Sequence, residues 1–105
     1  MNQSKIILGE ITRIIREREP SAKIILYGSR VRGTARSDSD WDVLILLDKE
    51  KITAEIEEYI SSPLYDLEFD TGEVISPMIY SESEWKLKYK ITPFYHNVMK
   101  EGKIL

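Results

Sequence analysis

The sequence YGSRVRGTARSDSDWD, residues 27–42, joins two short apolar segments of the chain. These segments, residues 23–27 and 42–47, are rich in isoleucine and leucine and have the length of strands. The second is almost continuously apolar, as expected for a strand that is buried on both faces. Gly28 and Ser29 end the first strand, and residues 30–35 predict a short helical turn before the second.

The first half of this stretch has the residues of a phosphate-binding loop. A glycine at the end of a strand lets a phosphate approach the backbone, so Gly28 and the Ser29 hydroxyl are candidate ligands. Positive charge lies close by on Arg30, Arg32 and Arg36, in a chain whose formal net charge is -3. Each feature alone is common in turns and on solvated faces, so the interpretation depends on their combination.

The second half carries a pair of aspartates suited to a metal ion. Asp40 and Asp42 stand two residues apart at the start of the second strand, which places their side chains on one face. Two carboxylates in that arrangement can share a hard cation with phosphate oxygens, as in magnesium sites. Trp41 lies between them and should point to the opposite face, into the core. Asp38 is assigned to the turn or to a supporting charge near the site, and not to the metal.

The pairs Gly28-Ser29 and Asp40-x-Asp42, with ten residues between them, resemble the G-S-x10-D-x-D signature of the DNA polymerase β-like nucleotidyltransferase superfamily. The intervening residues look like its minimal nucleotidyltransferase branch. The resemblance implies an α/β (α+β) fold, a small mixed β-sheet flanked by helices like the polymerase β palm. It also implies that the glycine and serine hold a nucleoside triphosphate, with ATP expected. The two aspartates would bind Mg²⁺ and be the catalytic residues.

The same resemblance extends to the neighbouring residues and to a partner. Arg32 and Gly33 match the pattern of the branch, for triphosphate contact and helix packing respectively, and Arg30 is counted with them among the nucleotide-binding residues. In this branch the partner is typically a helical HEPN-domain protein encoded alongside, and together they look like a toxin–antitoxin pair. The chain would then be an antitoxin that transfers AMP to a hydroxyl of its HEPN partner.

One position departs from the family pattern. Active members generally place a third carboxylate on the next strand, where the alignment offers Ser76. Glu73 is nearby, and three further acids could serve only if residues 65–69 form a strand instead of a helix, namely Asp66, Glu68 and Asp70. Without a third acid, nucleotide and metal binding could survive while in-line attack slows.

The alternative function is therefore a catalytically impaired module that binds a nucleotide or a partner without turnover. Exposed aromatic residues near the C-terminus would favour it, because they could form a contact surface; their other interpretation is core packing. The candidates are Trp85, Tyr89, Phe94 and Tyr95.

The rest of the chain alternates helical and strand patterns. Isoleucines recur at helical spacing through residues 3–18, with Ser4 as a candidate N-cap and Pro20 beyond the end. A kinked helix is expected over residues 53–70, with a new start at Ser62-Pro63. Other expected elements are a strand at 74–80, with Pro77 at an edge or bulge, and helices at 83–89 and 93–100. This order predicts one α/β domain across residues 1–105.

Composition limits the function classes. The acidic net charge gives no global attraction to nucleic acid, and no motif gives direct evidence for binding it. The chain has no cysteine, which excludes thiolate zinc sites, and its longest apolar run, residues 43–47, is too short to cross a membrane. His96 is the only histidine and has no matching ligands for a metal. We expect a cytoplasmic protein and leave self-association open.

Overall fold

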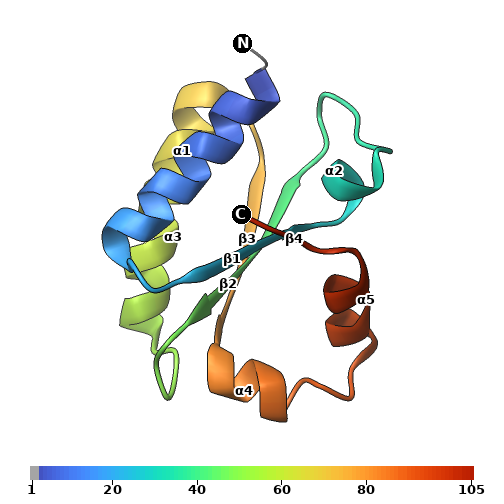
Figure 1. Ribbon diagram of the computed structural model, residues 1–105. Helices are drawn as coiled ribbons and strands as arrows, with labels where there is room; N and C mark the ends of the chain where they lie inside the picture. Colours follow the sequence, from blue (N-terminus) through green and yellow to red (C-terminus); the bar gives the residue numbers. More distant parts are fainter. Residues whose placement is uncertain (1–2) are drawn as a thin grey trace.

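The computed structural model describes residues 3–105 and contains a four-stranded mixed sheet in the order β3-β2-β1-β4 (Figure 1). β1 (Lys23–Tyr27) is antiparallel to β2 (Trp41–Leu47), and β2 is parallel to β3 (Ile75–Ser81). The short β4 (Lys103–Ile104) is antiparallel to β1 on its other side. This mixed sheet with its flanking helices confirms the expected fold class.

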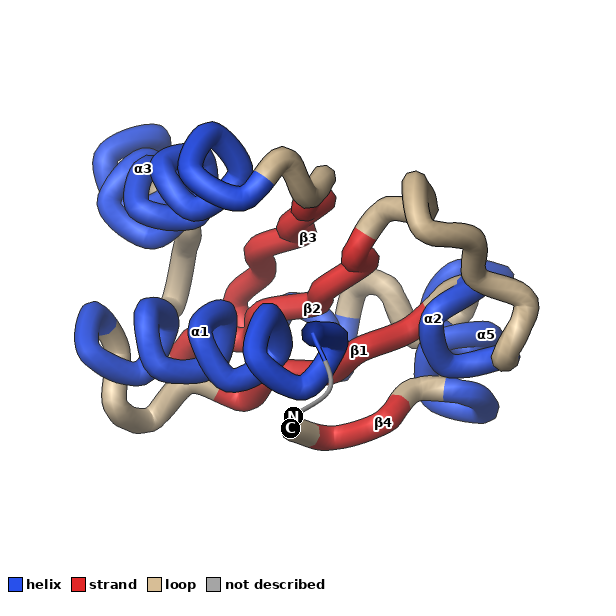
Figure 2. Tube along the Cα trace, turned by 90° about the horizontal axis from the view of Figure 1, so that it is seen from above, coloured by secondary structure: helices blue, strands red, loops and turns tan. Residues whose placement is uncertain are grey.

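One face of the sheet is covered by α1 (Gln3–Arg18) and α3 (Ala54–Thr71), which contact each other (Figure 2). The apolar stripe of α1 is buried, as its helical spacing predicts, and it joins alternate side chains of β1 and β2 in one core cluster. Trp41 belongs to this cluster and is 2% exposed, so the expectation that it points into the core is confirmed.

The other face is covered by α4 (Glu82–Leu87) and α5 (Pro93–Glu101). Trp85 is buried there, with its ring centroid 5.6 Å from that of Phe94 and 4.9 Å from that of Tyr95. Tyr89 packs against the same cluster. Core packing therefore describes Trp85 fully, whereas Tyr89, Phe94 and Tyr95 pack against the cluster and stay partly exposed.

Helix α3 runs without a break through Pro63, so the predicted new start at Ser62 is wrong, as is the competing strand at residues 65–69. The cap is Thr53, whose hydroxyl accepts a hydrogen bond from the N–H of Ile56 at 3.2 Å. Pro63 removes one hydrogen bond from the helix. Burial of the helix face around it, including Ile60 and Leu64, outweighs that loss.

Three smaller expectations can be compared with the structure. Pro77 lies in β3, which is an edge strand, as expected for a residue without an N–H. Ser4 lies inside α1 and does not precede it, so the predicted cap there is wrong. β4 was not predicted, because two exposed residues carry no periodic pattern.

No helix within residues 3–105 is long and apolar enough to span a membrane.

Candidate active site

The candidate site lies where β1 ends and where β2 and β3 begin. Tyr27, the last residue of β1, pairs with Asp42 of β2, and Asp42 pairs in turn with Ser76 of β3. Side chains two apart on a strand share a face, and Leu44 packs in the cluster under α4 and α5. Asp42 therefore projects toward the α5 side of the sheet, opposite to Trp41.

The backbone of Gly28 lies close to this acidic side chain. Its φ of 82° and ψ of -156° lie in a region that is almost restricted to glycine. A Cβ at this position would collide with the carboxylate of Asp42. The Gly28 carbonyl accepts hydrogen bonds from the N–H groups of Val31 and Arg32, both at 3.1 Å, which starts α2 (Ser29–Arg32) directly after the strand.

Gly33 ends this short helix in the left-handed conformation, with φ of 79°, and its N–H donates to the carbonyl of Ser29 at 3.1 Å. A Cβ on Gly33 would meet no atom within 4 Å. The expected helix-packing role of Gly33 is therefore wrong, and the residue serves the turn by its backbone conformation.

Asp40 and Asp42 lie together, as their spacing predicts. Burial raises the pKa of Asp42, the negative charge of Asp40 raises it further, and Arg32 acts in the opposite direction. Asp40 Oδ2 accepts a hydrogen bond from the Ser76 hydroxyl at 2.9 Å. A divalent cation between the two carboxylates would remove their repulsion, so the pair fits a magnesium ion that completes its shell with water and phosphate oxygens.

No third carboxylate joins the pair in residues 3–105, where no group of three metal-ligand side chains is found. Glu73 accepts a hydrogen bond from Trp41 Nε1 at 3.0 Å, and so lies on the far face of β2. Glu68 accepts from the N–H of Ile75 at 2.8 Å. The remaining candidates, Asp66 and Asp70, are exposed on α3.

The two arginines predicted to bind nucleotide have different surroundings. Arg32 is exposed, forms an ion pair with Glu101 of α5 at 3.0 Å, and acts electrostatically on Asp42. The Arg30 side chain is only 12% exposed, and its guanidinium lies 4.1 Å from the centre of the Trp41 ring. The structure thus places Arg32 beside the acidic pair and Arg30 on the opposite face of β2, over the Trp41 ring.

Two residues that the sequence did not indicate border the site. Burial, followed by the charge of Asp42 and by Tyr80, raises the pKa of Tyr27 to about 12, so its hydroxyl stays protonated. Glu101 anchors Arg32 from a helix far along the chain. Only the position of Tyr27, directly before Gly28, was available as a signal in the sequence.

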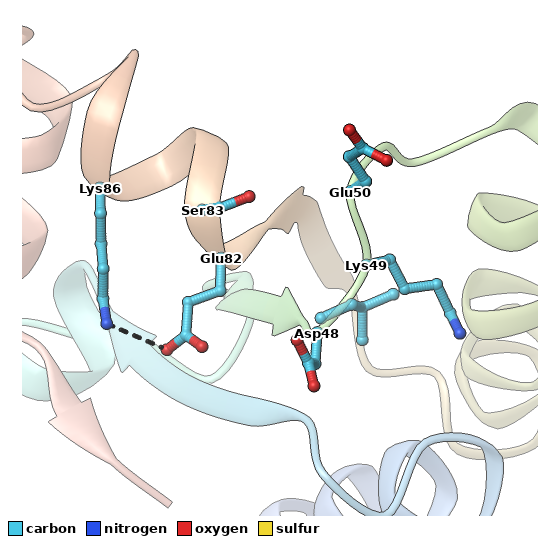
Figure 3. A pocket seen from close by; sticks show the side chains of 7 residues that line it. Asp48, Lys49, Glu50, Glu82, Ser83 and Lys86 are labelled. Atoms are coloured by element: carbon cyan, nitrogen blue, oxygen red, sulfur yellow. Dashed lines mark ion pairs between the residues drawn. The ribbon is translucent and has the colours of Figure 1, made fainter.

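A hollow of about 420 Å³ at the other end of β2 is a different feature (Figure 3). It is lined by Asp48, Lys49, Glu82 and Lys86, among others, and Lys86 forms an ion pair with Glu82 at 3.5 Å. Asp48 follows Asp42 by six residues along an extended chain, a distance of about 20 Å. This hollow therefore lies away from the paired aspartates.

The fold and the site together define a nucleotidyltransferase domain. A family model described as "Nucleotidyltransferase domain" matches residues 8–100, and the chain belongs to that family. It is 31% identical over 106 residues to "Putative protein adenylyltransferase MJ0604" of Methanocaldococcus jannaschii, with 100% of this chain and 99% of the relative covered.

Solved structures support the same fold. A toxin–antitoxin crystal structure with AMP-PNP has a TM-score of 0.62 and 21% identity, covering 99% of this chain and 72% of its own. A mutant form of the toxin–antitoxin MntA-HpeT has a TM-score of 0.61 and 19% identity, with the same two coverages. At this level of identity the likeness shows the fold alone.

The positive φ of Gly28 and its contact with Asp42 predict that Gly28→Ala destabilises the protein more than Gly33→Ala. Gly33→Ala adds the cost of a left-handed backbone, about 1–2 kcal/mol. Gly28→Ala adds the cost of a conformation almost restricted to glycine, about 1–3 kcal/mol. Gly28→Ala adds a collision worth roughly 1–3 kcal/mol more, because Asp42 must move. Urea unfolding of both variants measures the difference. Equal losses of unfolding free energy would show that the contact between Gly28 and Asp42 costs nothing to disturb.

The raised pKa of Asp42 predicts that Asp42→Asn stabilises the metal-free protein at pH 7. Ionised Asp42 is disfavoured in the folded state, and the wild type recovers this loss as the pH falls and the carboxyl takes up a proton. The advantage of Asp42→Asn should therefore shrink from pH 7 toward acid. Thermal unfolding in EDTA across this range tests the sign. A variant less stable than wild type at pH 7 would contradict it.

Proposed function

We propose that this protein is a protein adenylyltransferase, which binds ATP with Mg²⁺ and transfers AMP to a hydroxyl of a partner protein of the HEPN-domain type. The observation that carries the proposal is the contact of the Gly28 backbone with Asp42, next to Asp40. This arrangement supports the proposal because it brings the turn at Gly28, which would bind phosphate, and two carboxylates, which would bind the metal, to one point. The M. jannaschii relative, which matches the whole chain, is named as a putative protein adenylyltransferase, and this supports a protein as the acceptor.

The residues present divide the work of such a transfer. Gly28 and Ser29 would hold the phosphates at the start of α2, and Arg32 would neutralise part of their charge. Asp40 and Asp42 would hold magnesium, which supplies positive charge to the phosphate oxygens when bound. The acceptor hydroxyl oxygen bonds to the α-phosphorus, the bond from that phosphorus to pyrophosphate breaks, and the hydroxyl proton passes to water. The chain contributes mainly position and electrostatics.

Ser76 favours a second candidate function, a module that binds the nucleotide or partner without efficient turnover. Its hydroxyl occupies the cross-strand position opposite Asp42 and donates to Asp40. A hydroxyl there can orient Asp40, but it is a far weaker base than a carboxylate at neutral pH. The two functions differ in rate and not in the ligands that they require.

The proposed activity predicts label transfer from α-labelled ATP to the protein encoded beside this chain, in the presence of Mg²⁺. Transfer should be lost in the Asp40→Asn, Asp42→Asn double variant, since neither amide can replace a metal-binding carboxylate. The measurement is autoradiography of the separated proteins, with each protein alone as a control. Metal-dependent ATP binding without transfer would favour the impaired module. Loss of both would leave only the fold.

The position of Ser76 predicts a gain of function in Ser76→Asp. A carboxylate opposite Asp42 would complete a three-acid site, tighten Mn²⁺ binding and raise the transfer rate by about a hundredfold, the low end of general-base effects. Without metal the variant should be less stable than wild type, because a third negative charge joins the pair. Ser76→Ala is the matched control and should show no gain. An unchanged rate in Ser76→Asp would mean that the third acid does not limit turnover.

A further inference from the structure

We propose that Arg30 is a positioning residue for the Asp40 and Asp42 pair and not a nucleotide ligand. Through its contacts with Trp41 and Glu73, Arg30 restrains the start of β2 from the face opposite the two aspartates. This inference rests on the proposed function only in taking the two aspartates as the metal ligands.

The contacts of Arg30 all lie within the protein. Its Nη2 donates to the carbonyl of Ser39 at 2.8 Å and lies 3.7 Å from Glu73 Oε2. Its guanidinium covers the Trp41 ring at 4.1 Å, a cation–π contact. The same Glu73 oxygen accepts the N–H of the Trp41 ring at 3.0 Å. Arg30, Trp41 and Glu73 thus form one polar and aromatic cluster, the Arg30 cluster.

This cluster restrains the chain on both sides of Asp40. Ser39 precedes Asp40 and is held through its carbonyl, while Trp41 follows it and is held through its ring. The N–H of Trp41 also donates to the carbonyl of Val74 at 2.8 Å. Because neighbouring side chains on a strand point to opposite faces, fixing the Trp41 ring on one face directs Asp40 and Asp42 to the other.

The location of Arg30 argues against a direct contact with phosphate. Its guanidinium lies on the Trp41 side of β2, and Asp42 projects from the opposite side. With 12% of its side chain exposed, Arg30 would have to leave the carbonyl of Ser39 to reach a ligand. Arg32 is exposed and acts on Asp42, so it is the arginine placed to meet a triphosphate.

The two roles predict opposite losses in binding. Free Mn²⁺, followed by electron paramagnetic resonance without nucleotide, reports the acidic pair. Metal-free ATP binding, measured with EDTA by calorimetry, reports the phosphate contacts. A positioning role predicts that Arg30→Met and Arg30→Lys both weaken Mn²⁺ binding about tenfold or more, the usual effect of losing a supporting contact. Lysine keeps the charge but loses the planar stacking and the directed hydrogen bonds, so it should not rescue.

Controls separate this inference from the proposed function and from misfolding. Arg13→Met removes an exposed arginine of α1 and should leave both affinities unchanged. Trp41→Phe keeps a ring under Arg30 but removes the donor to Glu73, so it should weaken Mn²⁺ binding less than the Arg30 variants do. It tests the same cluster if Arg30→Met fails to fold. The Asp40→Asn, Asp42→Asn variant is the reference for a lost metal site.

Each result decides one point. Loss of Mn²⁺ binding in the Arg30 variants, with metal-free ATP binding retained, supports positioning. Loss of ATP binding with intact Mn²⁺ affinity, or rescue of both by Arg30→Lys, would overturn it in favour of a direct ligand. If the double aspartate variant keeps Mn²⁺ affinity, the metal site of the proposed function fails instead.

Discussion

The contact between the backbone of Gly28 and the carboxylate of Asp42 constrains everything around the site. It exists because β1 ends directly opposite the beginning of β2, so the turn after one strand meets the first side chains of the next. Only glycine leaves room for that approach. The same geometry starts α2 from the Gly28 carbonyl and leaves the Arg32 charge near Asp42. Strand pairing thereby brings the turn that we propose to bind phosphate close to the pair of acids.

Successive side chains of β2 point to opposite faces of the sheet, so its first residues have different roles. Asp40 and Asp42 face the α5 side, while Trp41 joins the core under α1 and α3. The two carboxylates therefore lie near water, whereas the Trp41 ring between them is buried and holds the start of the strand in place. The cost is visible in Asp42, whose pKa is raised by burial and by Asp40. A cation bound at the proposed metal site would remove this repulsion.

Most of the fold and the central residues of the site could be predicted from the sequence, since both follow from local patterns. Local spacing predicts the strand β2 from its continuous apolar run and the helix α1 from its isoleucines. It also predicts that the two aspartates lie on one face. Three things could not be predicted. A proline that looks like a helix start is carried inside α3 by the burial of its neighbours. β4 is too short to leave a pattern. The direction of Arg30 depends on Trp41 and Glu73, and residue type and spacing do not describe how side chains meet across elements.

The pairing of the last residues with β1 has a consequence for handling the protein. Besides the β4 pairing, the N–H of Leu105 donates to the carbonyl of Ile24 at 2.9 Å, and Arg16 donates to the carbonyl of Leu105 at 3.1 Å. These few residues cover an edge of the sheet whose strand, β1, carries Ile24, Ile25 and Leu26. A C-terminal tag or a protease cut that lifted them off would expose an apolar strand edge, which is a template for aggregation. An affinity tag is therefore better fused to the other end of the chain.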